Sequence, residues 1–258
     1  MNFMKKINQK LGALYDLSRL SLQGDATTEY SHILLACMPK SGSTFLSATI
    51  SHLPNYYKVS LVPGYQRREQ ELDYLNLVCY NRMNFIAQHH VKYSETLKKQ
   101  MNQFSIRPLV LIRNIFDVMV SLRDHIRAVG SRGPLVYIPF NVSKWSDEKL
   151  EIFLAINCIP WYISFYLSWQ ECEKKLLINY ADLLLNPNAV LDQIFSYANI
   201  NINTKQKKLI LEKGGNSFTR KNKAVNGRGK DIHPEARAHI MRVVSYYDEY
   251  DLSPIGIE

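Results

Sequence analysis

An apolar run, His32 to Met38, leads directly into a stretch of small residues, Pro39-Lys40-Ser41-Gly42-Ser43-Thr44. This order predicts a buried strand, a tight loop and the start of a helix. Such a junction directs backbone N–H groups and the positive end of a helix dipole at one point, where the amine of Lys40 adds a charge. The stretch therefore suits an anion such as a phosphate or a sulfate. An ordinary strand-to-helix turn with a serine cap would have a similar composition.

Further apolar runs alternate with helical patterns along the rest of the chain. We expect strands at 56–62, 84–91, 107–112 and 175–179. We expect helices at 44–52, 65–80, 94–104, 116–129, 147–173, 186–198, 204–212 and 234–247, the fifth of them broken near Pro160. This alternation predicts a single α/β domain, residues 31–258, with a mostly parallel sheet flanked by helices on both faces. Residues 1–30 are predicted to form an N-terminal helical extension.

The charge balance favours an anionic partner. The chain has 32 Lys+Arg against 23 Asp+Glu, a net charge of +9. Nucleotides, nucleic acids, anionic glycans and membrane surfaces all fit such a balance. The four cysteines, Cys37, Cys79, Cys158 and Cys172, lie far apart without a CxxC pair. Neither a zinc site nor a disulfide framework is indicated, so we expect a reducing compartment and no metal.

The N-terminal segment, residues 1–23, has no apolar core long enough for a signal peptide or a membrane span. We therefore expect a soluble, cytoplasmic protein. Apolar residues recur in this segment at steps of three or four, which predicts an amphipathic helix. That helix either packs on the domain or docks on a membrane surface, and the sequence does not choose between them.

Three polar residues lie at or just past the carboxyl ends of predicted strands: Lys40, His90 and Arg113. In parallel sheets ligands bind outside the carboxyl ends of the strands, so these side chains are expected to meet. The order Lys40-Ser41-Gly42-Ser43-Thr44 differs from the Walker loop GxxxxGK[ST], in which a glycine precedes the lysine. No GxGxxG motif and no Asp-rich strand end for magnesium accompanies it. The pattern favours group transfer without a metal over an ATP-dependent kinase.

Three segments resemble the sulfotransferases that use 3′-phosphoadenosine 5′-phosphosulfate (PAPS). The stretch from Pro39 to Phe45 resembles their 5′-phosphosulfate loop, and Arg113-Asn114-Ile115-Phe116-Asp117-Val118-Met119-Val120-Ser121 resembles the 3′-phosphate segment RxPxDxxxS. Phe218-Thr219-Arg220-Lys221 is similar to the closing FxRKG segment of the cytosolic enzymes. The resemblance implies a P-loop nucleotide-kinase-like fold, PAPS as the co-substrate and adenosine 3′,5′-bisphosphate (PAP) as the product.

The resemblance also implies the residues that bind the donor. A 3′-phosphate calls for a planar arginine and short hydroxyl donors, and the 5′ end for backbone N–H groups and a lysine. In the family's pattern these residues are Lys40, Ser41, Gly42, Ser43 and Thr44 at the 5′ end, and Arg113, Ser121, Arg220, Lys221 and Arg228 at the 3′ end. Phe45 replaces the tryptophan that stacks on adenine, and Tyr180 either lies near the adenine or packs in the core. Ile115 and Asn222 replace a proline and a glycine of the family.

Sulfuryl transfer needs a base for the attacking group and charge stabilisation for the leaving oxygen. Lys40 would serve the leaving oxygen. Gln88-His89-His90-Val91 resembles the KTH segment of cytosolic sulfotransferases and the HGHV segment of heparan sulfate 2-O-sulfotransferases, which implies His90 as the base. Glu69 and Glu71 are rival bases, or supports on the acceptor side.

The acceptor is the least determined part. The histidine segment and the positive charge favour a hydroxyl of a carbohydrate or glycan, with phenols, small alcohols and lipids left open. We expect acceptor contacts in 65–71 and 132–144, and no nucleic-acid partner. Two other interpretations remain: a non-catalytic binder of nucleic acid or another anionic polymer, and an ATP-dependent small-molecule kinase. The lysines of 205–223 lack the regular aromatic interleaving of a single-strand platform, which disfavours the first.

Overall fold

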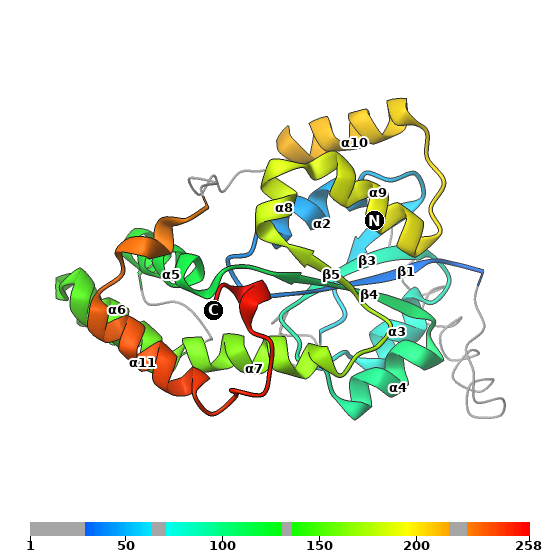
Figure 1. Ribbon diagram of the computed structural model, residues 1–258. Helices are drawn as coiled ribbons and strands as arrows, with labels where there is room; N and C mark the ends of the chain where they lie inside the picture. The colour runs from blue at the N-terminus through cyan, green and yellow to red at the C-terminus, as the bar shows by residue number, and fades with distance from the viewer. Residues whose placement is uncertain (1–28, 63–70, 131–135, 217–225) are drawn as a thin grey trace.

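Five parallel strands form one sheet in the order β2-β3-β1-β4-β5 (Figure 1). The computed structural model describes residues 29–62, 71–130, 136–216 and 226–258. The strands are β1 (His32–Cys37), β2 (Tyr56–Val59), β3 (Asn84–His89), β4 (Ile106–Ile112) and β5 (Leu176–Asn179). Ala36 of the central strand β1 is level with His89 on one side and Val110 on the other. The carboxyl ends of β1, β3 and β4 therefore meet at one edge, as the sequence predicts.

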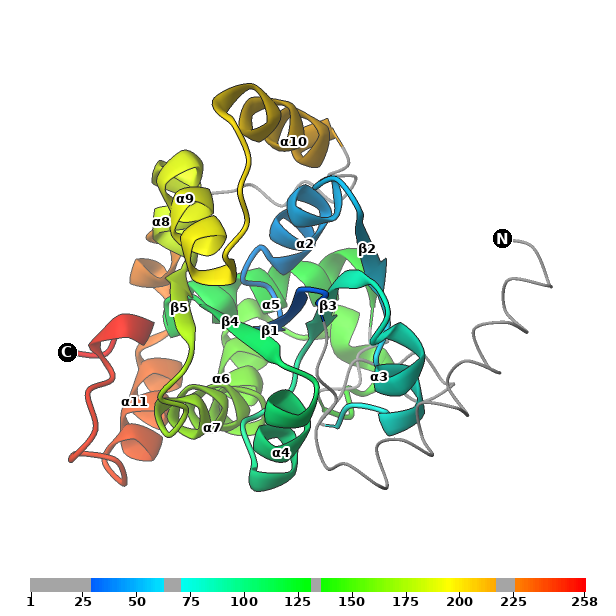
Figure 2. The same cartoon turned by 90° about the vertical axis from the view of Figure 1, so that its right-hand side faces the viewer.

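Helices cover both faces of the sheet (Figures 1 and 2). One face carries α2 (Ser43–Ser51), α8 (Tyr180–Leu185), α9 (Pro187–Ala198) and α10 (Thr204–Asn216). The core on the opposite face includes residues of six helices: α3 (Tyr74–Tyr80), α4 (Glu95–Gln103), α5 (Ile115–Val129), α6 (Asp147–Asn157), α7 (Ile159–Gln170) and α11 (Pro234–Val244). Alternate residues of β1 enter the two cores, because successive side chains of a strand point to opposite faces. Short 3₁₀ turns are η1 (Phe140–Lys144), η2 (Arg228–Asp231) and η3 (Ser253–Ile255). The predicted single α/β domain is confirmed.

The helix predicted at 65–80 is wrong at its start. Helix α3 begins at Tyr74, because the Asp73 side chain accepts a hydrogen bond from Asn76 N and caps the helix there. Residues 63–70 lie outside the described residues, as does almost all of the predicted extension 1–30. Helix α8 was not predicted, and α10 runs to Asn216 instead of ending at Glu212.

The predicted break in the long helix is present at Cys158, two residues before Pro160. By length and hydropathy alone, Asp147–Gln170 could cross a membrane. Its large side chains instead belong to the core: Tyr162, Phe165 and Trp169 are fully buried. Trp169 Nε1 also donates a hydrogen bond to the carbonyl of Val91, 2.9 Å away. In this fold α6 and α7 act as core helices.

Candidate active site

The loop between β1 and α2 has an unusual backbone. Lys40 and Gly42 both have positive φ, 68° and 84°. The buried Ser41 hydroxyl donates to the carbonyl of Met38 at 2.6 Å, which closes the turn. Gly42 is the N-cap of α2, and no side chain in the described parts of the chain caps that helix. Backbone N–H groups therefore form the positive end of α2, without a side-chain acceptor from the described residues. This is the arrangement expected for an anion site.

A chain of side-chain hydrogen bonds supports the first turn of α2. Gln88 of β3 donates through Nε2 to Ser43 Oγ at 2.7 Å and accepts through Oε1 from Ser47 Oγ at 2.9 Å. Lys58 Nζ, from the edge strand β2, donates to Ser47 Oγ at 2.9 Å. Thr44 is exposed, and Phe45 packs partly buried against the core on the α2 side of the sheet.

Arg113 follows β4 and connects the two predicted halves of the donor site. The residue is 4% exposed, and its guanidinium donates through Nη1 to the carbonyl of Lys40 at 2.9 Å. Its Cζ lies 4.3 Å from the ring centroid of Tyr180. Burial lowers the pKa of Arg113, and the neighbouring Tyr180 and Asp117 oppose that shift. The same Tyr180 ring covers Gly42: a Cβ there would lie 2.6 Å from Tyr180 Cε2. Tyr180 therefore contacts both halves.

Asp117 is a site residue that the sequence did not single out. The residue is 1% exposed, and its carboxylate accepts from Gly229 N at 2.7 Å and from Gly227 N at 2.8 Å. Asn114 caps α5 by accepting from the amides of Phe116 and Asp117. The fully buried Ser121 lies one turn after Asp117 on the same helix. The RxPxDxxxS pattern marks Asp117, but nothing in the sequence identifies partners more than a hundred residues later.

The predicted donor-site residue Arg228 pairs with the carboxylate of Asp124. Its Nη2 lies 2.5 Å from Asp124 Oδ2. Asp124 also pairs with Arg123, whose Nη1 lies 2.5 Å from Oε1 of the buried Glu151. Glu151 Oε2 in turn accepts from His233 N at 2.7 Å. Burial raises the pKa of Asp124, but the hydrogen bond and charge of Arg228 outweigh it and lower the pKa overall. Arg220 and Lys221 lie outside the described residues.

The two adjacent histidines have different environments. His89 is buried, and its Nε2 accepts from Leu61 N at 3.3 Å. His90 Nδ1 lies 2.7 Å from the carbonyl oxygen of Cys37, and the Cys37 thiol is 3.4 Å from the same nitrogen. A carbonyl oxygen accepts only, so Nδ1 of His90 carries the proton. In the neutral ring Nε2 then has the lone pair that a general base requires.

The structure gives less information on the rival bases, Glu69 and Glu71. Glu71 is exposed and precedes α3 by three residues, while Glu69 lies outside the described residues. Their assignment as bases or acceptor-side supports stays a prediction.

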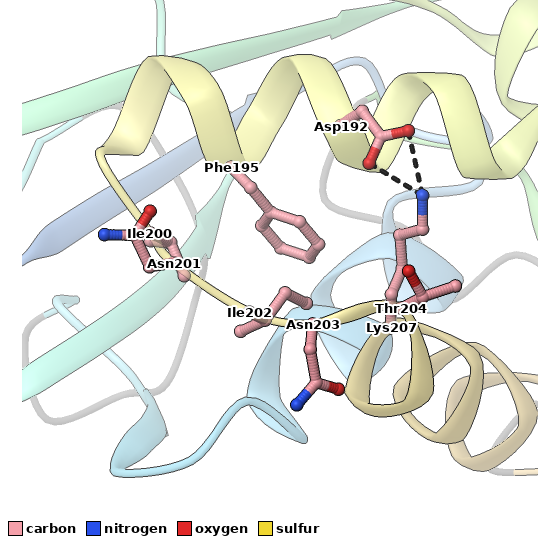
Figure 3. Close-up of a pocket in the computed structure, with 8 residues that line it drawn as sticks. All are labelled: Asp192, Phe195, Ile200, Asn201, Ile202, Asn203, Thr204 and Lys207. Carbon is pink, nitrogen blue, oxygen red and sulfur yellow. Dashed lines mark hydrogen bonds and ion pairs between the residues drawn. The ribbon is translucent and has the colours of Figure 1, made fainter.

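Two of the hollows on the described surface are lined by neither Lys40 nor His90. Figure 3 shows the smaller one, about 230 Å³, between α9 and the start of α10, where Lys207 Nζ pairs with Asp192 at 2.7 Å. The larger, about 560 Å³, adjoins Asn114, Gly229 and Arg237. Arg237 stacks on Phe116 and donates to the carbonyl of Gly229, so this hollow borders the back of the 3′ half.

Comparisons with known proteins identify a family and a fold. The family model described as "Sulfotransferase domain" matches residues 30–242. The fold is similar to that of mouse sulfotransferase SULT7A1 complexed with PAP (14% identity, TM-score 0.62, covering 91% of this chain and 89% of that one). It is also similar to sulfotransferase STF9 from Mycobacterium avium (13%, 0.56, 95% and 84%) and to the sulfotransferase domain of the Synechococcus PCC 7002 olefin synthase (13%, 0.53, 89% and 98%). No curated protein sequence matches the chain.

Proposed function

The chain belongs to the sulfotransferase domain family, and on that premise we propose that it transfers the sulfuryl group of PAPS to a hydroxyl of a carbohydrate acceptor, with His90 as the base. The donor supplies an activated sulfuryl group, whose bond to the 5′-phosphate oxygen breaks as the acceptor oxygen bonds to sulfur. The acceptor's proton passes to His90 Nε2, and the leaving electron pair stays on PAP. The observation that carries the proposal is the His90–Cys37 hydrogen bond, because it leaves Nε2 unprotonated.

The 5′ end of the donor is assigned to the loop before α2. The uncapped helix start offers backbone N–H groups to the 5′-phosphosulfate, together with the hydroxyls of Ser43 and Thr44. The Lys40 ammonium would neutralise charge that develops on the leaving oxygen, which is the task that most lowers the barrier to transfer. The support comes from the helix start and the loop conformation.

The 3′-phosphate is assigned to the junction of β4 and α5. A dianion there would meet the guanidinium of Arg113, the Ser121 hydroxyl and the loop that Asp117 holds, with Arg220, Lys221 and Arg228 nearby in the family's pattern. Phe45 is assigned to the adenine. This half would distinguish PAPS from ATP, which lacks a 3′-phosphate.

The acceptor is proposed to be a carbohydrate or other anionic glycan, in keeping with the net charge of +9. We assign the protein to the cytoplasm, and the N-terminal segment to packing on the domain or to contact with a membrane surface. Screening acceptor classes with labelled PAPS tests the acceptor assignment.

Nucleotide protection tests the donor. PAP should raise the melting temperature and ATP should not, because binding to the folded state stabilises it. Absence of any stabilisation by PAP would contradict the proposal, and protection by ATP would favour a kinase.

Two substitutions test the chemistry. His90→Ala should abolish sulfuryl transfer while PAP still binds, and Lys40→Ala should slow transfer strongly. His239→Ala, a histidine on α11, is the matched control and should keep both properties. Near-normal turnover by His90→Ala would move the base to Glu69 or Glu71.

A further inference from the structure

A one-way chain of hydrogen bonds runs from the edge of the sheet to the start of α2. It joins Lys58, Ser47, Gln88 and Ser43 in that order, through contacts of 2.9, 2.9 and 2.7 Å. Ser47 is fully buried, and Gln88 and Ser43 are each 5% exposed. Little water therefore reaches these groups to exchange their partners.

We propose that Gln88 and Lys58 are positioning residues that aim the Ser43 hydroxyl at the 5′-phosphosulfate of the donor, an inference that rests on the proposed function. The direction of the chain follows from the chemistry of its first member. An ammonium group only donates, so Ser47 must accept from Lys58. The Ser47 proton then goes to Gln88 Oε1 at 2.9 Å, since its other acceptor, the Thr44 carbonyl, is farther away at 3.3 Å.

The orientation of the Gln88 amide transmits this direction to Ser43. With Oε1 facing Ser47, the amide nitrogen faces Ser43 Oγ and donates to it. The Ser43 oxygen is thus already an acceptor, and its own proton points away from Gln88. Ser43 is the first residue of α2, where the helix dipole favours an anion. A hydroxyl held with its proton outward is ready to donate to that anion without reorientation.

The test measures what the 5′-phosphate contributes to affinity. Calorimetric titrations give the dissociation constants of PAP and of adenosine 3′-monophosphate. The constant of adenosine 3′-monophosphate divided by that of PAP measures what the 5′-phosphate adds to affinity. Gln88→Leu should lower this ratio about tenfold, because hydrogen bonds to charged groups are among the stronger ones. Lys58→Met should lower it about threefold, as expected for a partner one step removed. Lys99→Met, an exposed lysine of α4, is the control and should leave it unchanged.

Two further variants separate aiming from support of the fold. Gln88→Glu keeps the shape of the side chain, but a carboxylate accepts the Ser43 proton and adds a negative charge. It should therefore lower the ratio more than Gln88→Leu does. In Ser43→Ala, where nothing is left to aim, Lys58→Met should have no further effect.

The outcomes distinguish this inference from the proposed function. Affinity for adenosine 3′-monophosphate should stay within about twofold in every variant, which shows that the fold and the 3′ half are intact. A wild-type ratio in Gln88→Glu, or an undiminished effect of Lys58→Met in Ser43→Ala, would overturn the relay. Failure of the wild-type protein to bind either nucleotide would instead overturn the proposed function.

Discussion

The two halves of the candidate site are held in place by different forces. Around the 5′ half, the supports are mostly neutral: a serine hydroxyl on a carbonyl, and the Gln88 amide between two serines. Around the 3′ half, the supports are charged and buried, and Asp117 is the clearest case. Neutral supports add no charge of their own beside an incoming anion. Carboxylates beside Arg113 and Arg228 offset part of the positive charge there. We therefore expect the 3′ half to act more through the fixed positions of its groups than through electrostatic attraction of the anion.

The contrast between the two halves is clearest at Asp117, and its substitution is expected to have the largest effect on stability. Asp117→Ala leaves the amides of Gly227 and of the buried Gly229 without their acceptor, which should lower the free energy of unfolding by about 2–5 kcal/mol. It should also reduce the preference for PAP over adenosine 5′-monophosphate, since the 3′ loop loses its anchor. Urea denaturation and calorimetry measure the two effects. The control Asp248→Ala removes an exposed carboxylate; equal stabilities of the two variants would contradict the anchoring role.

A substitution that adds a methyl group at Gly42 tests the packing of the 5′ half. Gly42→Ala combines a positive φ with a Cβ only 2.6 Å from the Tyr180 ring, whereas Gly227 has nearly the same backbone conformation (φ 80°, ψ 14°, against φ 84°, ψ 9° at Gly42) and no atom of the described residues lies within 4 Å of where its Cβ would stand. Both variants should lose about 1–2 kcal/mol for the backbone conformation. Gly42→Ala should lose roughly 1–3 kcal/mol more from overpacking. Thermal unfolding of the pair measures the difference, and identical losses would mean that the ring moves aside freely.

Tyr180 contacts both halves, so its substitution should weaken the binding of both phosphates of PAP. Tyr180→Leu removes the ring face from Arg113, and we expect a loss of about 1 kcal/mol in PAP binding, shared between the two phosphates. Tyr180→Phe keeps the ring and should bind PAP normally. Affinities for PAP, adenosine 3′-monophosphate and adenosine 5′-monophosphate separate the two contributions. A loss confined to one phosphate would show that Tyr180 serves that half alone.

The smallest effect is expected at the partly exposed pair of Asp124 and Arg228. The pKa of Asp124 is lowered in the folded protein, so its ionised form stabilises the fold. This contribution is present above the unfolded pKa of about 3.9 and is lost as the pH falls through the lower folded value. Asp124→Asn should therefore cost about 0.5–1 kcal/mol at neutral pH, and less than that near pH 3. Melting temperatures at both pH values measure it, and a difference that persists at low pH would rule out the ionic origin.

Local sequence predicted much of the framework. All five strands lie where the sequence predicts them. The continuous burial expected of a parallel sheet covered on both faces holds for the inner strands β1, β3 and β4, whereas the edge strands β2 and β5 are only partly buried. Lys40, His90 and Arg113 were expected at one sheet edge because each lies at or just past the end of a predicted strand, and the strand registers bring those ends together. The glycine-containing loop and the start of α2 were likewise readable, since they depend on neighbours in the chain.

Partners distant in sequence could not be predicted. Gln88 was recognised only as part of a histidine segment, and its bonds to Ser43 and Ser47 arise from the packing of β3 against α2. Asp117 is one position of the RxPxDxxxS pattern and Glu151 has an ordinary sequence context, but the partners of both lie far along the chain. The start of α3 was missed because Asp73 caps the helix while the polar pattern extends further back.

The Asp117 anchor also has a consequence for how the molecule is assembled. Its carboxylate binds residues 110 and 112 positions later, whereas the bonds of Gln88 to the α2 segment span 41 and 45 positions. A chain still being synthesised can therefore form the bonds of Gln88 to Ser43 and Ser47 once β3 has emerged. It cannot close the loop on Asp117 until residue 229 is available. During folding, the Gln88 support of the loop proposed to hold the 5′-phosphosulfate can thus form before the Asp117 anchor of the loop proposed to hold the 3′-phosphate.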